Sequence, residues 1–126
     1  MYAGISEERP KAEPLESLEI TLSRGYHRQV DSRLSRFQDK YDSLKLTLRF
    51  AFENIEDHGS GRCVFSYGID TNGCLVVWLT DEDGGFDPRE IRRFKQSGEG
   101  YKEFCRSQAE VSHSPDGRST YLVGRP

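Results

Sequence analysis

The run Cys74–Thr80 is the feature that most constrains the fold of this chain. It contains Leu-Val-Val-Trp-Leu and is nearly continuously apolar, which is typical of a central strand of a sheet. The preceding turn, Asp70-Thr71-Asn72-Gly73, predicts a tight hairpin because Asn-Gly accepts positive φ. Residues Cys63–Ile69 supply the partner strand. A sheet is therefore predicted to form around this hairpin.

Two helices are predicted before the hairpin. The first, over residues 26–41, has apolar residues at helical spacing and charged residues on its other faces. The second begins at Asp42 or Ser43, which can cap it, and ends at Gly59 and Gly61. Its core-facing stripe has 4-3-4 spacing and consists of Leu44, Leu48, Ala51 and Ile55.

The flanking segments complete the order β-α-α-β-β-α-α-β-β. Residues Leu18–Leu22 alternate apolar and polar side chains, which predicts a half-buried strand. After the central hairpin we expect helices over 88–94 and 101–108 and a last hairpin of 110–113 with 119–123. This order predicts an α/β fold of the α+β two-layer sandwich type, a mixed sheet with helices mainly on one face.

Length and composition bound the domain organisation and the partners. The 126 residues suit one domain over 17–126, preceded by a charged segment over 1–16 that we expect to be a mobile N-terminal tail and not a signal peptide. The net charge of −3 argues against nucleic acid or an anionic membrane as the main partner. Three cysteines without a Cys-x-x-Cys pair are typical of reduced thiols in a cytoplasmic protein.

Three short motifs contain residues whose chemistry suits a nucleotide. Asn54 lies near the end of the second helix, and its neutral carboxamide oxygen can complete a magnesium shell. Asp81 follows the central strand, where its carboxylate can accept the exocyclic amine of adenine. Gly98-Glu99-Gly100 precedes a predicted helix, whose backbone N–H groups suit phosphate. Taken singly, each is more typical of a surface residue, an acidic turn or an ordinary helix start.

A calcium loop beginning at Asp81 is an alternative interpretation of the acidic residues after the central strand. It fails because Phe86 stands at the sixth position, where a calcium loop requires glycine. In addition, Arg92 stands at the twelfth position, where a bidentate glutamate is needed. The acidic segment therefore does not predict a calcium site.

As a set, the motifs resemble the histidine-kinase-like ATPase superfamily, which includes gyrase and the histidine kinases. Residues 54–59 (Asn-Ile-Glu-Asp-His-Gly) resemble its N box. Residues 81–88 (Asp-Glu-Asp-Gly-Gly-Phe-Asp-Pro) resemble its first glycine box, and residues 98–101 (Gly-Glu-Gly-Tyr) its second. The Gly-Phe-Asp-Pro ending, the small size and the closing strand over 117–123 look most like the bacterial anti-sigma factor and serine-kinase family.

The resemblance implies a fold, cofactors and partners. The fold would be of the Bergerat type, with a mixed, largely antiparallel sheet and helices on one face. The cofactors would be ATP and Mg²⁺. The partner would be a protein such as a sigma factor or an anti-sigma antagonist, with a homodimer left open. These expectations belong to the family and are carried to this chain through the three motifs.

The resemblance also implies a set of site residues. Asn54 would bind magnesium, Asp81 would hold adenine, and a residue of the last strand would support the base. The glycines would approach the base and the phosphates. The implied nucleotide-binding set is Asn54, Asp81, Gly85, Gly98, Gly100 and Thr120, with Ser119 as the alternative to Thr120.

Three departures from the family pattern affect catalysis. Phe50 stands one helical turn before Asn54, where the family has its general-base glutamate. Asp83 replaces the first glycine of the first glycine box, and the short, basic segment 88–95 stands where the family has its lid. Because a phenyl ring accepts no proton, and a missing base removes about 10²–10⁴ in rate, efficient phosphoryl transfer is not expected. Glu53 and Asp57 point about 100° and 60° away from Asn54 around the helix axis, so rescue of catalysis by either acid is a minor alternative.

These observations leave three interpretations. The first is an ATP-binding regulatory protein with a degenerate catalytic site, acting by partner switching. The second is an active ATP-dependent serine/threonine kinase with an unusual base. The third is a scaffold that no longer binds nucleotide, in which Asp83 and the short segment 88–95 close the pocket.

Overall fold

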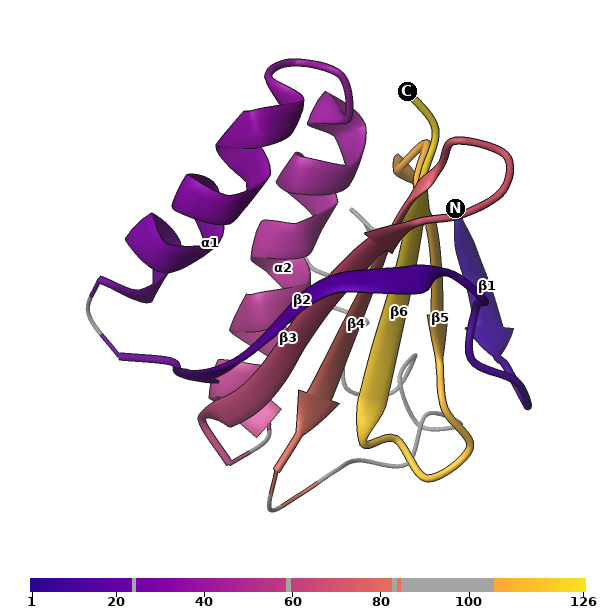
Figure 1. The fold of residues 1–126 in the computed structure, drawn as a ribbon. Coiled ribbons are helices and arrows are strands. Elements are labelled where there is room, and N and C mark those ends of the chain that lie inside the picture. The colour runs from indigo at the N-terminus through magenta and orange to yellow at the C-terminus, as the bar shows by residue number, and fades with distance from the viewer. Residues whose placement is uncertain (24, 59, 83, 85–105) are drawn as a thin grey trace.

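The structure is a computed structural model and describes residues 1–23, 25–58, 60–82, 84 and 106–126. Within them the chain forms a six-stranded sheet and two α-helices (Figure 1). The elements in order are β1 (Tyr2–Ile5), β2 (Glu13–Thr21), α1 (Tyr26–Leu34), the 3-10 turn η1 (Ser35–Phe37), α2 (Asp42–His58), β3 (Arg62–Ile69), β4 (Leu75–Asp81), β5 (Glu110–His113) and β6 (Ser119–Gly124).

The sheet has the order β1-β5-β6-β4-β3-β2 and is mixed, because β1 pairs with β5 in parallel and the other pairs are antiparallel. The hairpin of β3 and β4 lies in its middle, and Gly73 in the connecting turn has a φ of 80°, as the Asn-Gly sequence predicts. Both described α-helices lie against one face, the inner face; the opposite face is the outer face (Figure 1). The predicted central strand and mixed sheet are confirmed.

The inner face carries the main core. The predicted stripe of α2, Leu44, Leu48, Ala51 and Ile55, is buried throughout, which confirms the helical register. These side chains pack on alternate residues of the strands, such as Phe65 of β3 and Leu79 of β4. Gly124 lets α2 approach β6 closely, because a Cβ at this position would lie 2.7 Å from the Leu44 Cβ.

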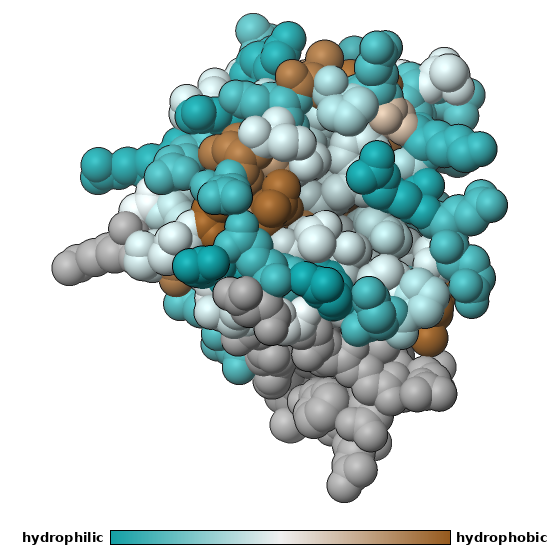
Figure 2. Space-filling view, turned by 60° about the horizontal axis from the view of Figure 1, so that its bottom comes forward, coloured by the Kyte–Doolittle hydropathy of each residue, from teal (hydrophilic) through white to brown (hydrophobic). Residues whose placement is uncertain are grey.

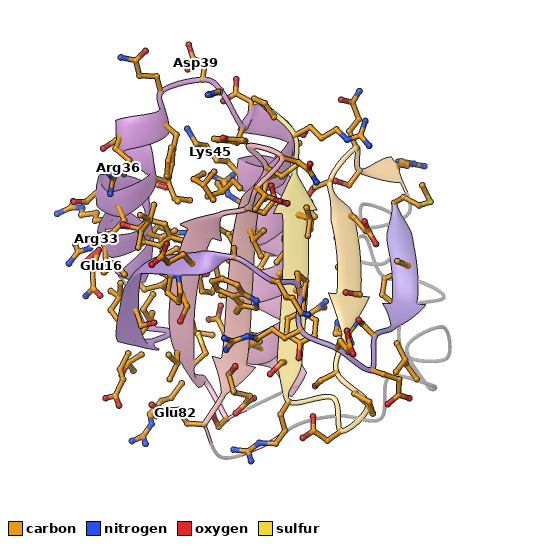
Figure 3. The ribbon with its side chains drawn as sticks, turned by 45° about the vertical axis from the view of Figure 1, so that its right-hand side comes forward. Glu16, Arg33, Arg36, Asp39, Lys45 and Glu82 are labelled. Carbon is orange, nitrogen blue, oxygen red and sulfur yellow. The ribbon has the colours of Figure 1, made fainter. Side chains whose placement is uncertain are left out.

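The first sixteen residues differ from the expected mobile tail, since they contain β1 and the start of β2. Both strands lie at edges of the sheet, and the charged side chains of β2 remain in solvent there, so the start of β2 resembles an unstructured segment in composition. The N-terminal amine donates hydrogen bonds to the carbonyls of Ser107 and Ala109. Glu16 of β2 forms an ion pair with Arg33 of α1 at 3.3 Å, and the two side chains lie side by side in Figure 3.

The first helix is shorter than predicted. α1 ends at Leu34, η1 follows, and Gln38 takes a positive φ of 51° that ends the helical path before Tyr41. The last hairpin, β5 with β6, agrees with its prediction. The helix predicted over 88–94 lies outside the described residues, as does most of the one over 101–108.

Two observations concern the surface. None of the helices in the described part of the chain is long and apolar enough to cross a membrane. Viewed with the end of the sheet where β4 terminates turned forward, the coloured surface is mainly hydrophilic, with small separate hydrophobic patches (Figure 2).

Candidate nucleotide site

The inner face of the sheet changes from apolar to polar where β4 ends. Alternate residues of a strand share a face, so Asp81 continues the row of core residues that includes Val77 and Leu79. Thr120 on β6 pairs with Leu79 and belongs to the same face as the core residue Leu122. The Asp81 and Thr120 side chains are buried, with 3% and 4% of their surface exposed. Two predicted site residues therefore lie on neighbouring strands and face the helices.

Asn54 faces the same layer from the opposite side. It lies in the last turns of α2 beside the core residues Ala51 and Ile55, and only 6% of its surface is exposed. α2 ends at His58, and Ser60, two residues further on, donates a hydrogen bond to the Asp81 carboxylate. The carboxyl ends of α2 and β4 therefore lie at the same end of the molecule. The structure thus places Asn54, Asp81 and Thr120 in the layer between α2 and the sheet.

Three backbone and hydroxyl donors hold the Asp81 carboxylate. Ser60 donates its backbone N–H to Oδ2 at 3.0 Å and its hydroxyl to Oδ1 at 2.6 Å. Gly84 donates its backbone N–H to Oδ1 at 3.0 Å. An ionised carboxylate only accepts hydrogen bonds, and these donors fix the plane in which its oxygens accept others. Ser60 was not predicted, because a serine after a helix-ending glycine looks like an ordinary turn residue.

The chain that leaves β4 is held by a second, exposed set of contacts. Arg118 donates to the backbone carbonyls of Asp81 at 3.3 Å and Glu82 at 2.8 Å. Glu82, labelled at the lower end of Figure 3, forms an ion pair with Arg62 at 3.0 Å. These contacts hold the end of β4 and Glu82. The sequence offered no pattern that marks Arg118 for this contact.

Cys63 lies directly beside Asp81, because the two residues pair across β3 and β4. Burial raises the pKa of its thiol to about 12, and the neighbouring Asp81 carboxylate acts in the same direction. A thiol with this pKa stays protonated at neutral pH and is a poor nucleophile. Cys63 and Cys74 are buried, and Cys105 lies outside the described residues, so the reduced state of the thiols stays a prediction.

The two candidates on the last strand lie on opposite faces of the sheet. The Ser119 hydroxyl lies 3.1 Å from the Thr80 hydroxyl on the outer face, opposite to the layer that contains Asp81. Thr120 faces the helices and is buried on the same face as Asp81. A role of either residue in supporting a base stays a prediction.

Phe50 lies one turn before Asn54 and is half-buried against the edge of the main core. Its position beside Asn54 also predicts that its face of α2 borders a nucleotide cleft and not the central core. This prediction is wrong in part, because the Phe50 ring packs against the main core. Glu53 and Asp57, the two acids beside Asn54, are exposed. Neither of these two acids is buried beside Asn54.

The remaining predicted residues lie outside the described part of the chain. These are Gly85, Gly98 and Gly100, together with Asp83 and the basic segment 88–95. Cavities of about 280 and 750 Å³ are lined by described residues, and neither includes Asn54 or Asp81. The motif set predicts that Asn54 and Asp81 face one concave pocket, and this stays a prediction.

The chemistry of the described side chains can be compared with that of ATP and Mg²⁺. No group of three or more His, Cys, Asp or Glu side chains among the described residues could hold a metal ion. A magnesium ion that is carried mainly by phosphate oxygens needs only one protein oxygen here, which the Asn54 carboxamide can supply. Asp81 is an acceptor for an amine and Thr120 can either donate or accept. Each of the three side chains thus has a polar group of the kind that ATP or Mg²⁺ requires, and binding of these cofactors stays a prediction.

The comparisons give no relative from which to transfer a function. Comparison with protein-family models, with curated proteins and with solved structures finds no match to this chain. The functional argument therefore depends on the residues of the site itself.

Proposed function

We propose that this chain is a cytoplasmic, ATP-binding regulatory protein of the anti-sigma factor and serine-kinase type, with a Bergerat-type fold and a degenerate catalytic site. One observation carries the proposal: Asn54, Asp81 and Thr120 are buried polar side chains in the layer between α2 and the sheet, where the neighbouring rows are apolar. Burying polar side chains costs free energy, so such a set is expected where it has a use.

Each of the three side chains has a role in the proposal. The Asp81 carboxylate accepts the exocyclic amine of adenine, in the plane that Ser60 and Gly84 fix. Thr120 supports the base from β6, and Asn54 supplies one oxygen to Mg²⁺. Gly85 lines the base pocket, and Gly98 and Gly100 bind the phosphates through their backbone N–H groups. Bound ATP and Mg²⁺ would change the charge at the site, and the affinity of the chain for its partner proteins would change with it.

The proposal assigns binding and not turnover to this site. The ring of Phe50 accepts no proton, and the acids Glu53 and Asp57 are exposed on other sides of α2. A bound nucleotide would then persist and stabilise one surface for a partner protein, such as a sigma factor or its antagonist. ATP would act as an effector through its differential affinity for two states of the protein.

A thermal-shift titration with Mg-ATP tests nucleotide binding, because a ligand of the native state raises the unfolding midpoint. Parent protein and an Asp57→Asn control should shift upward equally, whereas Asp81→Asn should shift much less. Radiolabelled phosphate transfer to a captured partner should stay at background for the parent. An absent shift in the parent would contradict the proposal, and transfer at an enzymatic rate would favour the kinase.

A scaffold that binds no nucleotide is the second candidate, and the three protein donors on Asp81 favour it, because they also suit a purely structural carboxylate. Ser60→Ala separates the two candidates. It removes one hydrogen bond and costs about 1 kcal/mol of stability in either case. In the ATP-binding protein it should also weaken Mg-ATP binding several-fold, because the carboxylate loses its orientation, whereas a scaffold shows the stability loss alone.

A further inference from the structure

A seven-residue segment crosses the outer face of the sheet. β1 ends at Ile5 on one edge and β2 begins at Glu13 on the other, so residues 6–12 must span the strands between them. Figure 1 shows the chain turning back from the end of β1 at the right-hand edge and entering β2, whose ribbon lies in front of the sheet in this view. We call residues 6–12 the strap. It belongs to no strand, and none of its side chains is fully buried.

The strap covers a small hydrophobic cluster that is separate from the main core. Val76, Trp78 and Tyr121 form this cluster on the outer face, and Ala12 of the strap packs against it. Although both described α-helices lie on the other face, only 2% of the Trp78 surface is exposed. Among the described residues, Arg9, Pro10 and Ala12 of the strap contact this cluster, together with Val123 of β6.

The contacts between the strap and Trp78 are those by which proteins recognise peptides. The indole N–H of Trp78 donates a hydrogen bond to the backbone carbonyl of Pro10 at 3.1 Å. The guanidinium carbon of Arg9 lies over the indole, 5.0 Å from the ring centroid. Grooves lined by aromatic side chains bind extended proline-containing segments in this way, and arginine prefers tryptophan among cation–π partners.

We propose that the outer face around Trp78 and Tyr121 is a binding surface for an extended Arg-Pro segment of a partner protein. The strap, with Arg9 and Pro10, is its intramolecular occupant. A covalently attached occupant competes at high effective concentration, so a free segment binds weakly until the strap is released. The surface lies on the opposite face from the candidate nucleotide site, and the proposal stands whether or not ATP binds.

The strap can be replaced by a partner segment because most of its side chains make few packing contacts with the rest of the protein. Glu7, Glu8 and Lys11 are exposed and leave no packing behind when the segment lifts. Arg9 is exposed as well, apart from its contact with the indole. An incoming Arg-Pro segment offers the same carbonyl and the same guanidinium, so it replaces the strap contact for contact.

The single tryptophan of the chain allows a direct test, because all tryptophan fluorescence comes from Trp78. The probe is a peptide with the sequence of residues 6–14, Ser-Glu-Glu-Arg-Pro-Lys-Ala-Glu-Pro. The full-length double variant Arg9→Ala/Ala12→Asp removes the cation and places a carboxylate against the cluster. We expect acrylamide to quench Trp78 fluorescence more strongly in this variant than in the parent. Added peptide should protect Trp78 from quenching in a saturable way, and it should bind the variant about tenfold more tightly than the parent.

Matched controls accompany the test. A Lys11→Ala variant changes an exposed strap residue and should behave as the parent. A peptide with alanine for its arginine and first proline should bind at least several-fold more weakly. Circular dichroism establishes that each variant is folded, and Arg9→Ala alone takes the place of the double variant if that one unfolds.

Three outcomes would overturn the proposal. The first is that Trp78 is as protected in the folded variant as in the parent. The second is that the peptide gives no saturable change, or that the alanine peptide binds equally well. The third is a concentration-dependent dimer on size-exclusion chromatography that removes peptide binding, since a second copy of this chain would then be the occupant.

Discussion

The inner face of the sheet is covered by α1 and by the seventeen-residue α2, whereas the described cover of the outer face is the strap of residues 6–12. On the inner face a continuous stripe from α2 belongs to a core that includes buried residues of five strands, β2 to β6. On the outer face the cluster of Val76, Trp78 and Tyr121 is contacted by Arg9, Pro10 and Ala12 of the strap. Nearly equal burial thus results from a rigid helix on one face and from a segment without regular structure on the other.

This difference shows that the exposed fraction of the buried residues alone does not indicate which face of the sheet keeps its cover. Elements with few packed contacts open locally at a lower free energy than the core, and binding regions are drawn from such elements. The inner face should therefore behave as the stable core with a polar end. The outer face should respond to changes in its cover.

The largest expected effect concerns Cys63 on the inner face. Its pKa is raised from 9.0 to about 12 by burial, a difference of three units, which at 1.36 kcal/mol per unit corresponds to about 4 kcal/mol. The unfolded thiol loses its proton first, so this stabilisation is complete below pH 9 and is lost between about pH 9 and 12. Urea unfolding of parent and Cys63→Ala at several pH values measures it. A parent that loses no more stability than the variant across this range would contradict the buried, protonated thiol.

Two adjacent valines on β4 compare the faces with the same substitution. Val77 is buried against the helices and Val76 against the outer cluster, with 0% and 1% of their surfaces exposed. Val77→Ala should cost about 2–3 kcal/mol, because the helix-packed core cannot collapse into the cavity. Val76→Ala should cost about half as much, since the strap can move into the space. Equal losses in chemical unfolding would remove the distinction between the faces.

The elements on the inner face were predictable because their patterns are local. The 4-3-4 stripe from Leu44 to Ile55 and the apolar run of β4 each define a face without reference to the rest of the chain. β1 and the start of β2 were not predictable in this way. β2 is an edge strand with exposed charged residues such as Glu13, so the composition of its start resembles that of a mobile tail. The parallel pairing of β1 with β5 joins residues more than a hundred positions apart, and no local pattern contains it.

The candidate site was predictable to a similar extent. Asn54, Asp81 and Thr120 were identified through motifs, and the structure places all three in one layer. Ser60 was not predicted, because its contribution to the site is a hydrogen bond to Asp81, a residue 21 positions away in the sequence. Likewise, the strap was missed because the proximity of Pro10 to Trp78 depends on the strand order.

Phe50→Glu tests whether the missing base limits the proposed site. The substitution should cost about 1–2 kcal/mol, since it removes a half-buried ring from the edge of the core. If the rest of the site binds Mg-ATP, hydrolysis or phosphate transfer should rise by at least about tenfold, part of the range that a general base supplies. A folded Phe50→Glu variant without any gain would show that more than the base is absent. Phe50→Ala is the matched control and should show no gain.

Calorimetric titration of the parent protein with Mg-ATP and Mg-GTP tests the central claim most directly, that the polar end of the inner face binds adenine through Asp81. The carboxylate accepts hydrogen bonds and should attract the exocyclic amine of adenine, while the carbonyl of guanine at the same position should repel it. We predict saturable binding of Mg-ATP that is at least about tenfold tighter than that of Mg-GTP, and loss of this preference in Asp81→Asn. Absence of heat with Mg-ATP, or equal affinity for the two nucleotides, would contradict the account.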